Sequence, residues 1–293
     1  MQGLIDLHLH SNKSSDGDLT PLHIIKLAKE YGFRAISIAD HDTVDAYPQA
    51  IQFGKKNGVE VIPNMELTTL FQDREFHLLL PFLNWKSKAV SRLIHRVYDK
   101  RVNEAKMRIK KLREMGFDID WKKVNKYTKG IPPLGVTLAQ ILLDEAAKRD
   151  DASLQKYFKE ENKHFAPYIF YKDYFTYKKP AYVQKQNIDL LDVLKNISKT
   201  GGVPVLAHPG AYFQNVSKQD IMLLKKAGLQ GIEVFTSYHD SFQTQYYQNI
   251  ADEFDLVPTA GSDFHGRIKP NIVFGVIKEG EYWMINELRK RKK

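Results

Sequence analysis

The chain contains no cysteine among its 293 residues. Disulfide bonds, thiolate nucleophiles, and zinc or iron–sulfur sites with thiolate ligands are therefore excluded. No apolar run reaches the roughly 18 residues that a membrane-spanning helix needs, and the first residues lack a basic segment followed by an apolar stretch. We therefore expect a cytoplasmic protein that binds no membrane, and nothing indicates an obligate protein partner. Any metal ion must be held by histidine, aspartate and glutamate side chains.

The composition is ordinary for a folded protein, with 43% hydrophobic and 27% charged residues. The net charge of +9, however, is unevenly distributed. Residues 86–180 carry 23 lysines and arginines against 12 aspartates and glutamates, whereas the rest of the chain carries 21 against 23. A basic segment of this kind can attract phosphates or nucleic acid, and it can equally be a set of solvated lysine-rich helix faces.

Apolar runs typical of strands recur along the chain, and helix-like periodicity follows them. The seven runs cover residues 4–10, 35–40, 59–63, 76–82, 203–208, 231–235 and 256–261. Between the first two, Thr20, Pro21 and Gly32 are typical of the cap, the first residue and the end of a helix. Alternation of strands and helices favours a mainly parallel sheet or barrel, and we expect an α/β barrel.

Residues 86–180 interrupt this alternation. Apolar residues recur there at helical spacing from Val90 onward, and the pattern ends at Gly116. A second helical segment and an aromatic-rich stretch follow before the barrel pattern returns. We therefore expect a barrel formed by residues 1–85 and 181–293, with residues 86–180 inserted as a helical, basic lid or substrate domain.

Histidine, aspartate and glutamate residues gather where the predicted strands end. In a parallel barrel the carboxyl ends of the strands meet at one rim, where barrel enzymes place their catalytic groups. The candidate metal ligands are His8, His10, Asp16, His41, Glu66, His77, His208, Asp263 and His265. His77 fits less well because it lies near the start of its predicted strand, where a core histidine bonded to the backbone is the alternative.

These nine residues exceed the four ligands that one zinc ion needs. We therefore predict two or three divalent ions, with Glu66 as a bridging carboxylate. Imidazole and carboxylate ligands suit manganese, zinc or iron, and the sequence does not choose among them. Asp6, Asp40 and Asp42 are candidates to orient the ligand histidines from behind, with ordinary solvation at strand ends as the alternative.

Six motifs, in this order, resemble the PHP (polymerase and histidinol phosphatase) superfamily of metal-dependent phosphoesterases. They are DLHLHSNKSSDG, ADHDT, MEL, FHLLLPF, AHPG and GSDFHG. The helical insertion is similar to that of the branch containing nucleoside 3′,5′-bisphosphate phosphatases and 5′-to-3′ exoribonucleases. The resemblance implies a distorted (β/α)7 TIM-like barrel with a trinuclear metal centre.

The resemblance also implies how the ligands divide among three ions. His8, His10, Glu66 and Asp263 would hold the first ion, Glu66, His77 and His208 the second, and Asp16, His41 and His265 the third. Asp16 stands where some members have histidine. Nucleotide-processing members usually carry an Arg–His pair at the start of the second insertion helix, where this chain reads PLGVTLAQILL. The phosphate-clamping role of that pair is therefore missing or relocated here.

Clustered divalent ions lower the pKa of bound water towards neutrality and offset charge on phosphoryl oxygens. The expected nucleophile is therefore a metal-bound hydroxide, and no protein side chain is needed in that role. The expected substrate is a phosphorylated small molecule, a nucleotide or a short oligonucleotide. His239, Arg267 and Lys269 are candidate phosphate contacts, although the two cations can also be ordinary exposed loop residues.

Two other function classes remain open. An amidohydrolase-like barrel would cleave C–N or C–O bonds, but such barrels generally carry a bridging lysine where this chain offers Glu66. A metal-stabilised nucleic-acid-binding module would use the basic insertion and stack bases on its aromatic residues. These aromatics are Tyr168, Phe170, Tyr171, Tyr174, Phe175 and Tyr177. The simpler expectation is that they pack the insertion onto the barrel.

Overall fold

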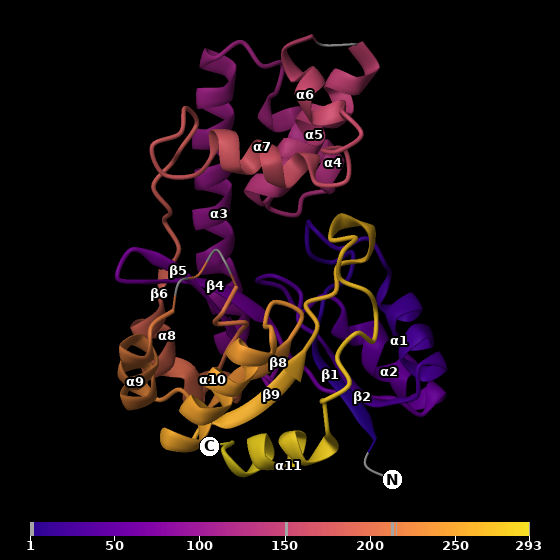
Figure 1. Cartoon of the computed structure of the whole chain (residues 1–293), viewed down its shortest axis with the longest axis vertical. Coiled ribbons are helices and arrows are strands. Elements are labelled where there is room, and N and C mark those ends of the chain that lie inside the picture. Colours follow the sequence, from indigo (N-terminus) through magenta and orange to yellow (C-terminus); the bar gives the residue numbers. More distant parts are fainter. Residues whose placement is uncertain (1–2, 150–151, 212–213, 215, 293) are drawn as a thin grey trace. The chain divides into compact units, whose positions relative to one another are not determined.

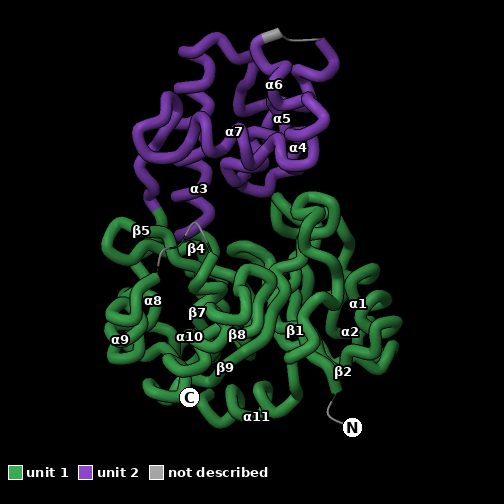
Figure 2. The backbone as a smooth tube through the Cα atoms, in the orientation of Figure 1, with its two compact units in different colours: residues 1–95, 187–293 green, residues 96–186 purple. Residues whose placement is uncertain are grey.

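The computed structural model describes residues 3–149, 152–211, 214 and 216–292. The chain divides into two compact units, one of Met1–His95 with Asn187–Lys293 and the other of Arg96–Gln186 (Figure 2). Among the described residues, none of the helices is both long and apolar enough to cross a bilayer.

The strands of the first unit form two sheets (Figure 1). The smaller sheet is parallel and has the order β1 (Leu4–Leu9), β2 (Phe33–Ile38) and β3 (Glu60–Val61). The larger sheet has the order β6 (Ile188–Asp189), β4 (Glu66–Phe71), β5 (Arg74–Leu79), β7 (Val205–Leu206), β8 (Gly231–Thr236) and β9 (Val257–Gly261). Single backbone bridges from Leu9 to Phe264 and from His41 to Glu66 join the two sheets. The expected distorted α/β barrel is therefore confirmed.

Helices flank these strands (Figure 1). They are α1 (Pro21–Glu30), α2 (Tyr47–Asn57), α8 (Leu190–Asn196), α9 (Lys218–Ala227), α10 (Ser241–Glu253) and α11 (Tyr282–Lys290), with short 3₁₀ turns at Ile197–Thr200 and Gly266–Ile268. The oxygen of Thr20 caps α1 by accepting from the backbone of His23, and Pro21 opens the helix as its sequence predicts. The apolar faces of α1 and α2 bury Ile24, Ile25 and Ala50 against β1 and β2.

Each of the seven predicted runs overlaps a strand, and β4 and β6 are strands that the sequence pattern does not predict. The chain reverses between β4 and β5 at Gln72 and Asp73, whose φ angles are 51° and 61°. This tight hairpin makes β5 antiparallel to β4, and β5 also runs antiparallel to β7. The sheet is thus mainly parallel, as predicted, except around β5.

The second unit is helical. Its helices are α3 (Lys88–Glu114), which begins in the first unit, α4 (Trp121–Thr128), α5 (Gly135–Arg149), α6 (Gln155–Phe158) and α7 (Ala166–Tyr174), with a 3₁₀ turn at Ala152–Leu154. Several of the aromatic residues predicted to pack onto the barrel instead belong to the core of this unit. Phe170 and Phe175 are fully buried there, and Tyr174 stacks on Phe170 with ring centroids 4.3 Å apart.

Candidate metal centre

The side chains predicted as metal ligands come from the ends of different strands and lie together in the first unit. β1 carries His8 and leads to His10, the following loop carries Asp16, and His41 follows β2. Glu66 is the first residue of β4, His77 lies within β5, and His208 follows β7. Asp263 and His265 follow β9. All nine side chains are buried or nearly so.

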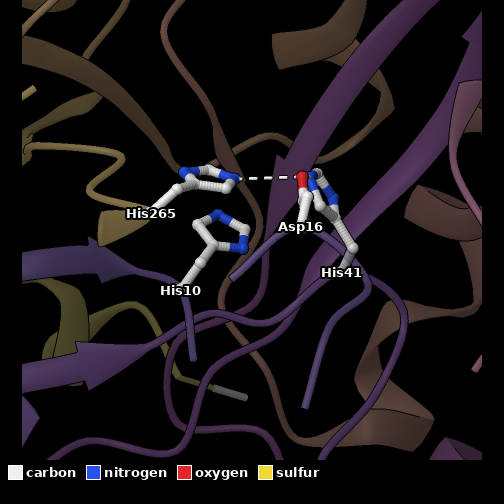
Figure 3. A group of neighbouring side chains, drawn as sticks. All are labelled: His10, Asp16, His41 and His265. Carbon is white, nitrogen blue, oxygen red and sulfur yellow. Dashed lines mark hydrogen bonds and ion pairs between the residues drawn. The ribbon is translucent and has the colours of Figure 1, made fainter. Parts of the chain in front are cut away.

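Eight of these residues form three overlapping groups whose potential ligand atoms lie within 4.8 Å of one another. The groups are His8, His10, Glu66 and Asp263; His10, Asp16, His41 and His265 (Figure 3); and His41, Glu66 and His77. The ninth residue, His208, places its Nε2 3.0 Å from Oε1 of Glu66. The structure therefore brings the whole predicted set together.

Glu66 lies at the centre of this set. Its Oε2 is 3.3 Å from Nε2 of His8 and 3.1 Å from both Nε2 of His10 and Nδ1 of His41. Its Oε1 is 2.8 Å from Nδ1 of His77. Because the two oxygens of one carboxylate face different histidines, Glu66 has the arrangement that a bridging ligand requires.

Several buried atoms of the cluster have no hydrogen-bond partner. They are Nε2 of His8, both ring nitrogens of His10, Oδ1 of Asp16, Nδ1 of His41, Oε2 of Glu66 and Oδ1 of Asp263. An unsatisfied buried polar atom costs about 1–3 kcal/mol, and more when the group is charged. Divalent cations bound at these groups would give most of these atoms a partner, and nitrogen and oxygen donors are what such cations need. The residues present therefore fit a metal site.

Burial and neighbouring charges shift the pKa values of the cluster. Burial lowers the pKa of His41, His208 and His265, which favours the neutral imidazole. Burial alone would raise the pKa of Glu66, but the positive charge of neighbouring histidines lowers it well below its ordinary value. Neutral imidazoles and an ionised carboxylate are the protonation states that metal binding requires.

Three histidines are shifted in the other direction. Burial would lower the pKa of His8, but the negative charges of Glu66, Glu233 and Asp263 outweigh burial and raise this pKa well above its ordinary value. Burial would lower the pKa of His10 and His77, but adjacent carboxylates outweigh burial and raise both values to about 9. These imidazoles therefore hold protons at neutral pH unless a cation displaces them. Metal binding at this cluster must release protons.

Backbone strain marks two of the candidate ligands. His208 and Asp263 have positive φ angles of 24° and 58°, in a region that residues with a side chain rarely adopt. Such conformations persist where the surrounding structure fixes them, and they cluster at functional sites.

Glu233 of β8 holds two of the histidines and was not predicted. Its Oε1 accepts a hydrogen bond from Nδ1 of His8 at 3.1 Å, and its Oε2 accepts from the backbone N–H of His208 at 2.8 Å. A Cβ on Gly261 would lie 2.2 Å from Oε1 of Glu233, so only glycine fits there. The sequence did contain a signal, because a charged residue in the middle of an apolar strand needs a buried partner.

Tyr238 and Lys269 hold the carboxylate of Asp263. The hydroxyl of Tyr238 donates to Oδ2 of Asp263 at 2.5 Å, and Nζ of Lys269 donates to the same oxygen at 2.6 Å. Oδ1 of Asp263 faces the imidazoles instead, 3.1 Å from Nε2 of His10. Lys269, predicted as a phosphate contact, is thus bonded to a candidate metal ligand. The sequence pattern singles out His239 as a functional residue and does not identify its neighbour Tyr238.

His239 and Arg267, the other predicted phosphate contacts, have different partners. Nδ1 of His239 donates to the carbonyl of Val234 at 2.8 Å, and Nε2 accepts from the backbone N–H of Gly210 at 2.9 Å. Neither ring nitrogen is left for a phosphate, which contradicts the prediction for His239. Nε of Arg267 donates to Asp18 at 2.7 Å, while 92% of the Arg267 side chain is exposed.

The three aspartates predicted to orient ligand histidines accept hydrogen bonds from the backbone. Asp40 accepts from the backbone and hydroxyl of Ser11 at 2.6 and 2.7 Å, which fixes the loop leading to Asp16. Asp6 accepts from the backbone N–H groups of His8 and Ser262, and Asp42 accepts from that of Thr68. Burial raises the pKa of Asp6 and of Asp40 to about 6. Through these contacts the aspartates fix the backbone at the strand ends.

Comparisons with known proteins agree with this geometry. A family model described as PHP domain matches residues 6–174. A 5′-3′ exoribonuclease from Haemophilus influenzae is 28% identical over 89% of each chain. A 3′,5′-nucleoside bisphosphate phosphatase from Chromobacterium violaceum is 25% identical over 89% of this chain and 87% of its own. The same fold occurs in a crystal structure from Bifidobacterium adolescentis, with a TM-score of 0.80 and 24% identity over 99% of this chain and 96% of that one.

Proposed function

The chain belongs to the PHP domain family, and on this basis we propose that it is a metal-dependent phosphoesterase. Its substrates would be the phosphomonoester or phosphodiester bonds of a nucleotide or short oligonucleotide. The observation that carries the proposal is Glu66, a buried carboxylate whose two oxygens face different histidines. The names of two relatives, both matched over 89% of this chain, support the nucleotide class of substrate.

We assign two or three divalent ions, of manganese, zinc or iron, to the cluster. His8, His10, Glu66 and Asp263 would hold one, His77, His208 and Glu66 a second, and Asp16, His41 and His265 a third. The ligand groupings and the contact of His208 with Glu66 support this division. When bound, such ions supply a water-derived nucleophile at neutral pH and neutralise charge on the phosphoryl oxygens.

The chain itself would contribute positioning and charge. Tyr238 and Lys269 hold Asp263 from one side, so that its other oxygen stays directed at the imidazoles. The ammonium group of Lys269 also places a positive charge beside the cluster, which favours an anionic phosphoryl group there. Arg267 extends from the same loop with an exposed guanidinium, and we assign it a weaker contact with the substrate.

The two alternative functions have less support. An amidohydrolase-like reaction would place a lysine where Glu66 lies between the histidines. A module that only binds nucleic acid would stack bases on the aromatics predicted for this role, of which Phe170 and Phe175 are fully buried and Tyr177 is 71% exposed. Hydrolysis of phosphoesters remains the function that best fits the buried cluster.

The test is metal analysis of the purified protein together with a substrate screen. We expect two to three divalent ions per chain, and release of phosphate from nucleotides after reconstitution with manganese, zinc or iron. Lactams and carboxylic esters belong in the same screen, because their turnover without phosphate release would favour the amidohydrolase alternative. Failure to release phosphate from nucleotides, together with failure to release mononucleotides from an oligoribonucleotide, with any metal would overturn the proposal.

A pair of variants separates the cluster from general damage. His8→Ala/His10→Ala should lose both bound metal and hydrolysis. The matched control is His95→Ala/His164→Ala, which removes two exposed histidines and should keep both. Normal RNA binding by the first variant, combined with no turnover by the parent, would instead support a binding module.

A further inference from the structure

The second unit contains a groove that lies between α3 and α4 and combines positive charge with an aromatic ring. Its volume is about 430 Å³, and it is lined by Lys106, Ile109, Lys110, Arg113, Glu114 and Trp121. We propose that this groove binds single-stranded oligoribonucleotides as an accessory site. The inference rests on the proposed function, because it specifies an oligonucleotide as the substrate class that the enzyme retains.

Three cations line one face of α3. Lys106, Lys110 and Arg113 are exposed and are spaced four and three residues apart, so their side chains share a face of the helix over about 10 Å of its axis. One carboxylate, Glu114, faces the same groove, with Oε1 3.9 Å from Nζ of Lys110. The lining therefore carries a positive excess that can meet successive phosphates of a flexible strand.

Trp121 forms the aromatic part of the lining. It is the first residue of α4, and the carboxylate of Asp120 caps this helix by accepting from the backbone of Lys123 at 2.8 Å. The indole is partly buried against the core of the unit, which holds the ring in place. Nζ of Lys106 lies over the ring, 5.2 Å from its centroid, so a positive charge is placed against one face of the indole.

Charge complementarity and the aromatic ring together favour a nucleic acid. The segment of residues 86–180 has 23 cationic against 12 anionic side chains. The nearby acidic residue Asp118 is already bonded to Lys123 and Arg149. An acidic peptide would satisfy the cations but has no base to stack on Trp121, whereas a single strand offers phosphates and bases together.

The binding test uses the fluorescence of Trp121 in the full-length chain. Trp85→Phe/Trp283→Phe leaves Trp121 as the single tryptophan. A short oligouridylate with phosphorothioate linkages, which resists hydrolysis, should quench this fluorescence. Since each phosphate contact on a single strand contributes about −0.7 to the slope of log K against log salt, three contacts predict a slope of about −2.

Charge variants identify the groove as the binding site. Lys106→Gln/Lys110→Gln/Arg113→Gln should weaken binding of the oligouridylate at least tenfold and flatten the salt slope. The matched control is Lys26→Gln/Lys55→Gln/Lys56→Gln, which removes three exposed lysines of α1 and α2 and should change binding less than twofold. Equal weakening by both triple variants, or equal affinity for polyglutamate, would overturn the proposal.

Activity measurements keep this inference separate from the proposed function. In the groove variant, hydrolysis of a mononucleotide should be unchanged, and KM for the unmodified oligoribonucleotide should rise about tenfold. If the groove variant keeps both an unchanged KM for the oligoribonucleotide and normal mononucleotide turnover, the groove proposal is refuted and the phosphoesterase proposal stands. Salt-dependent quenching without hydrolysis of either mononucleotides or oligoribonucleotides would instead support the groove and refute the phosphoesterase.

Discussion

A neutral imidazole carries a proton on one ring nitrogen and can bind a cation only through the other. The residue that accepts a hydrogen bond from the protonated nitrogen therefore determines which nitrogen is available to the cation. Glu233 accepts from Nδ1 of His8, so Nε2 is the nitrogen that faces Glu66 and Asp263. Partners of this kind typically change metal affinity 10- to 100-fold.

We therefore expect Glu233→Gln to lower metal affinity by about one to two orders of magnitude, because the substitution keeps the shape but removes the charge. Competition with a chelator measures the affinity. Glu253→Gln is the control, since Glu253 pairs with Lys218 on the surface and should leave the affinity unchanged. Equal affinity in parent and Glu233→Gln would contradict the role of Glu233.

Lys269 and Arg267 lie on one loop and differ in their surroundings. Lys269 is 15% exposed and bonds Asp263, whereas Arg267 is exposed and bonds Asp18. We expect Lys269→Gln to lower kcat at least tenfold and to weaken metal binding, because Asp263 loses a charged donor. Arg267→Gln should change mainly KM, by less than about threefold. Steady-state kinetics and metal titration measure these effects. A larger loss of kcat or of metal affinity in Arg267→Gln than in Lys269→Gln would reverse the roles assigned to the two residues.

Sequence reasoning located the candidate ligands but not the residues that hold them. Residue types such as His8, His41 and Asp263 stand out because imidazoles and carboxylates recur where strands end. Glu233 is a charged residue in an otherwise apolar strand and Tyr238 lies in a loop, and neither feature shows which atoms these side chains contact across the barrel. Such contacts join residues more than 20 positions apart in the chain, and composition gives no information about them.

At the scale of elements, β9 lies very close to β1 at Gly261. A Cβ on Gly261 would lie 2.4 Å from Cβ of His8 as well as against Glu233. We expect Gly261→Ala to destabilise the protein by about 2–4 kcal/mol and to weaken metal binding, because β9 or His8 must shift. Gly58→Ala is the control. Gly58 has φ +73° but open space around it, so only about 1 kcal/mol is lost there. Urea denaturation gives both values, and equal losses would argue against a steric cause.

The start of α9 is tied to β5 by an ion pair. Arg74 donates to both oxygens of Asp220, and Asp220 also closes the capping box with Ser217. Although burial opposes it, these partners lower the pKa of Asp220 to about 2 from 3.8. Because the folded-state pKa is the lower one, the resulting stability is present above about pH 4 and is lost as the pH falls towards 2.

We therefore expect Asp220→Asn to destabilise the protein at pH 7 by about 1 kcal/mol, a value reduced for the partial exposure of Arg74. The difference between parent and variant should shrink as the pH falls below about 4. Denaturation in urea at a series of pH values measures the difference in free energy of unfolding between parent and variant. Arg74→Gln is the other single variant of a double-mutant cycle with Asp220→Asn. If the difference in free energy of unfolding does not depend on pH, the charge of Asp220 is unimportant.

Element prediction failed where turn chemistry was unusual. The hairpin between β4 and β5 turns at Gln72 and Asp73 with two positive φ angles, without the Asn-Gly or Asp-Gly pair that normally signals such a turn. Without that signal, Glu66 was placed after a strand rather than at the start of β4. His77 was likewise placed near the start of its strand, although it lies well inside β5 and pairs with Thr68.

At the scale of the whole molecule, the interrupted alternation of strands and helices was enough to indicate an inserted helical segment. The compact units divide at residues 95 and 186, whereas the sequence pattern suggested 85 and 180. The reason is α3, one continuous helix from Lys88 to Glu114 that contributes to both units. Periodicity shows where a helix begins, but it does not show which core each of its turns joins.

Because each unit buries its own hydrophobic residues, we predict that the two units respond differently to metal. The candidate ligands all belong to the first unit, whereas Phe170 and Leu138 belong to the separate core of the second. Ligand at about 1,000 times its Kd stabilises a folded state by about 4 kcal/mol. For a domain of this size, that corresponds to roughly 10 °C in Tm.

Calorimetry of the full chain with and without a chelator should therefore show two transitions, of which only one moves. We expect chelation to lower the Tm of the first unit by roughly 10 °C and to leave that of the second within about 1 °C, because the second unit lacks the ligand cluster. In His8→Ala/His10→Ala, the first transition should no longer respond to added manganese or zinc. A parallel shift of both transitions would mean that the units unfold together. If neither transition shifts, the buried imidazoles and carboxylates do not hold a stabilising cation.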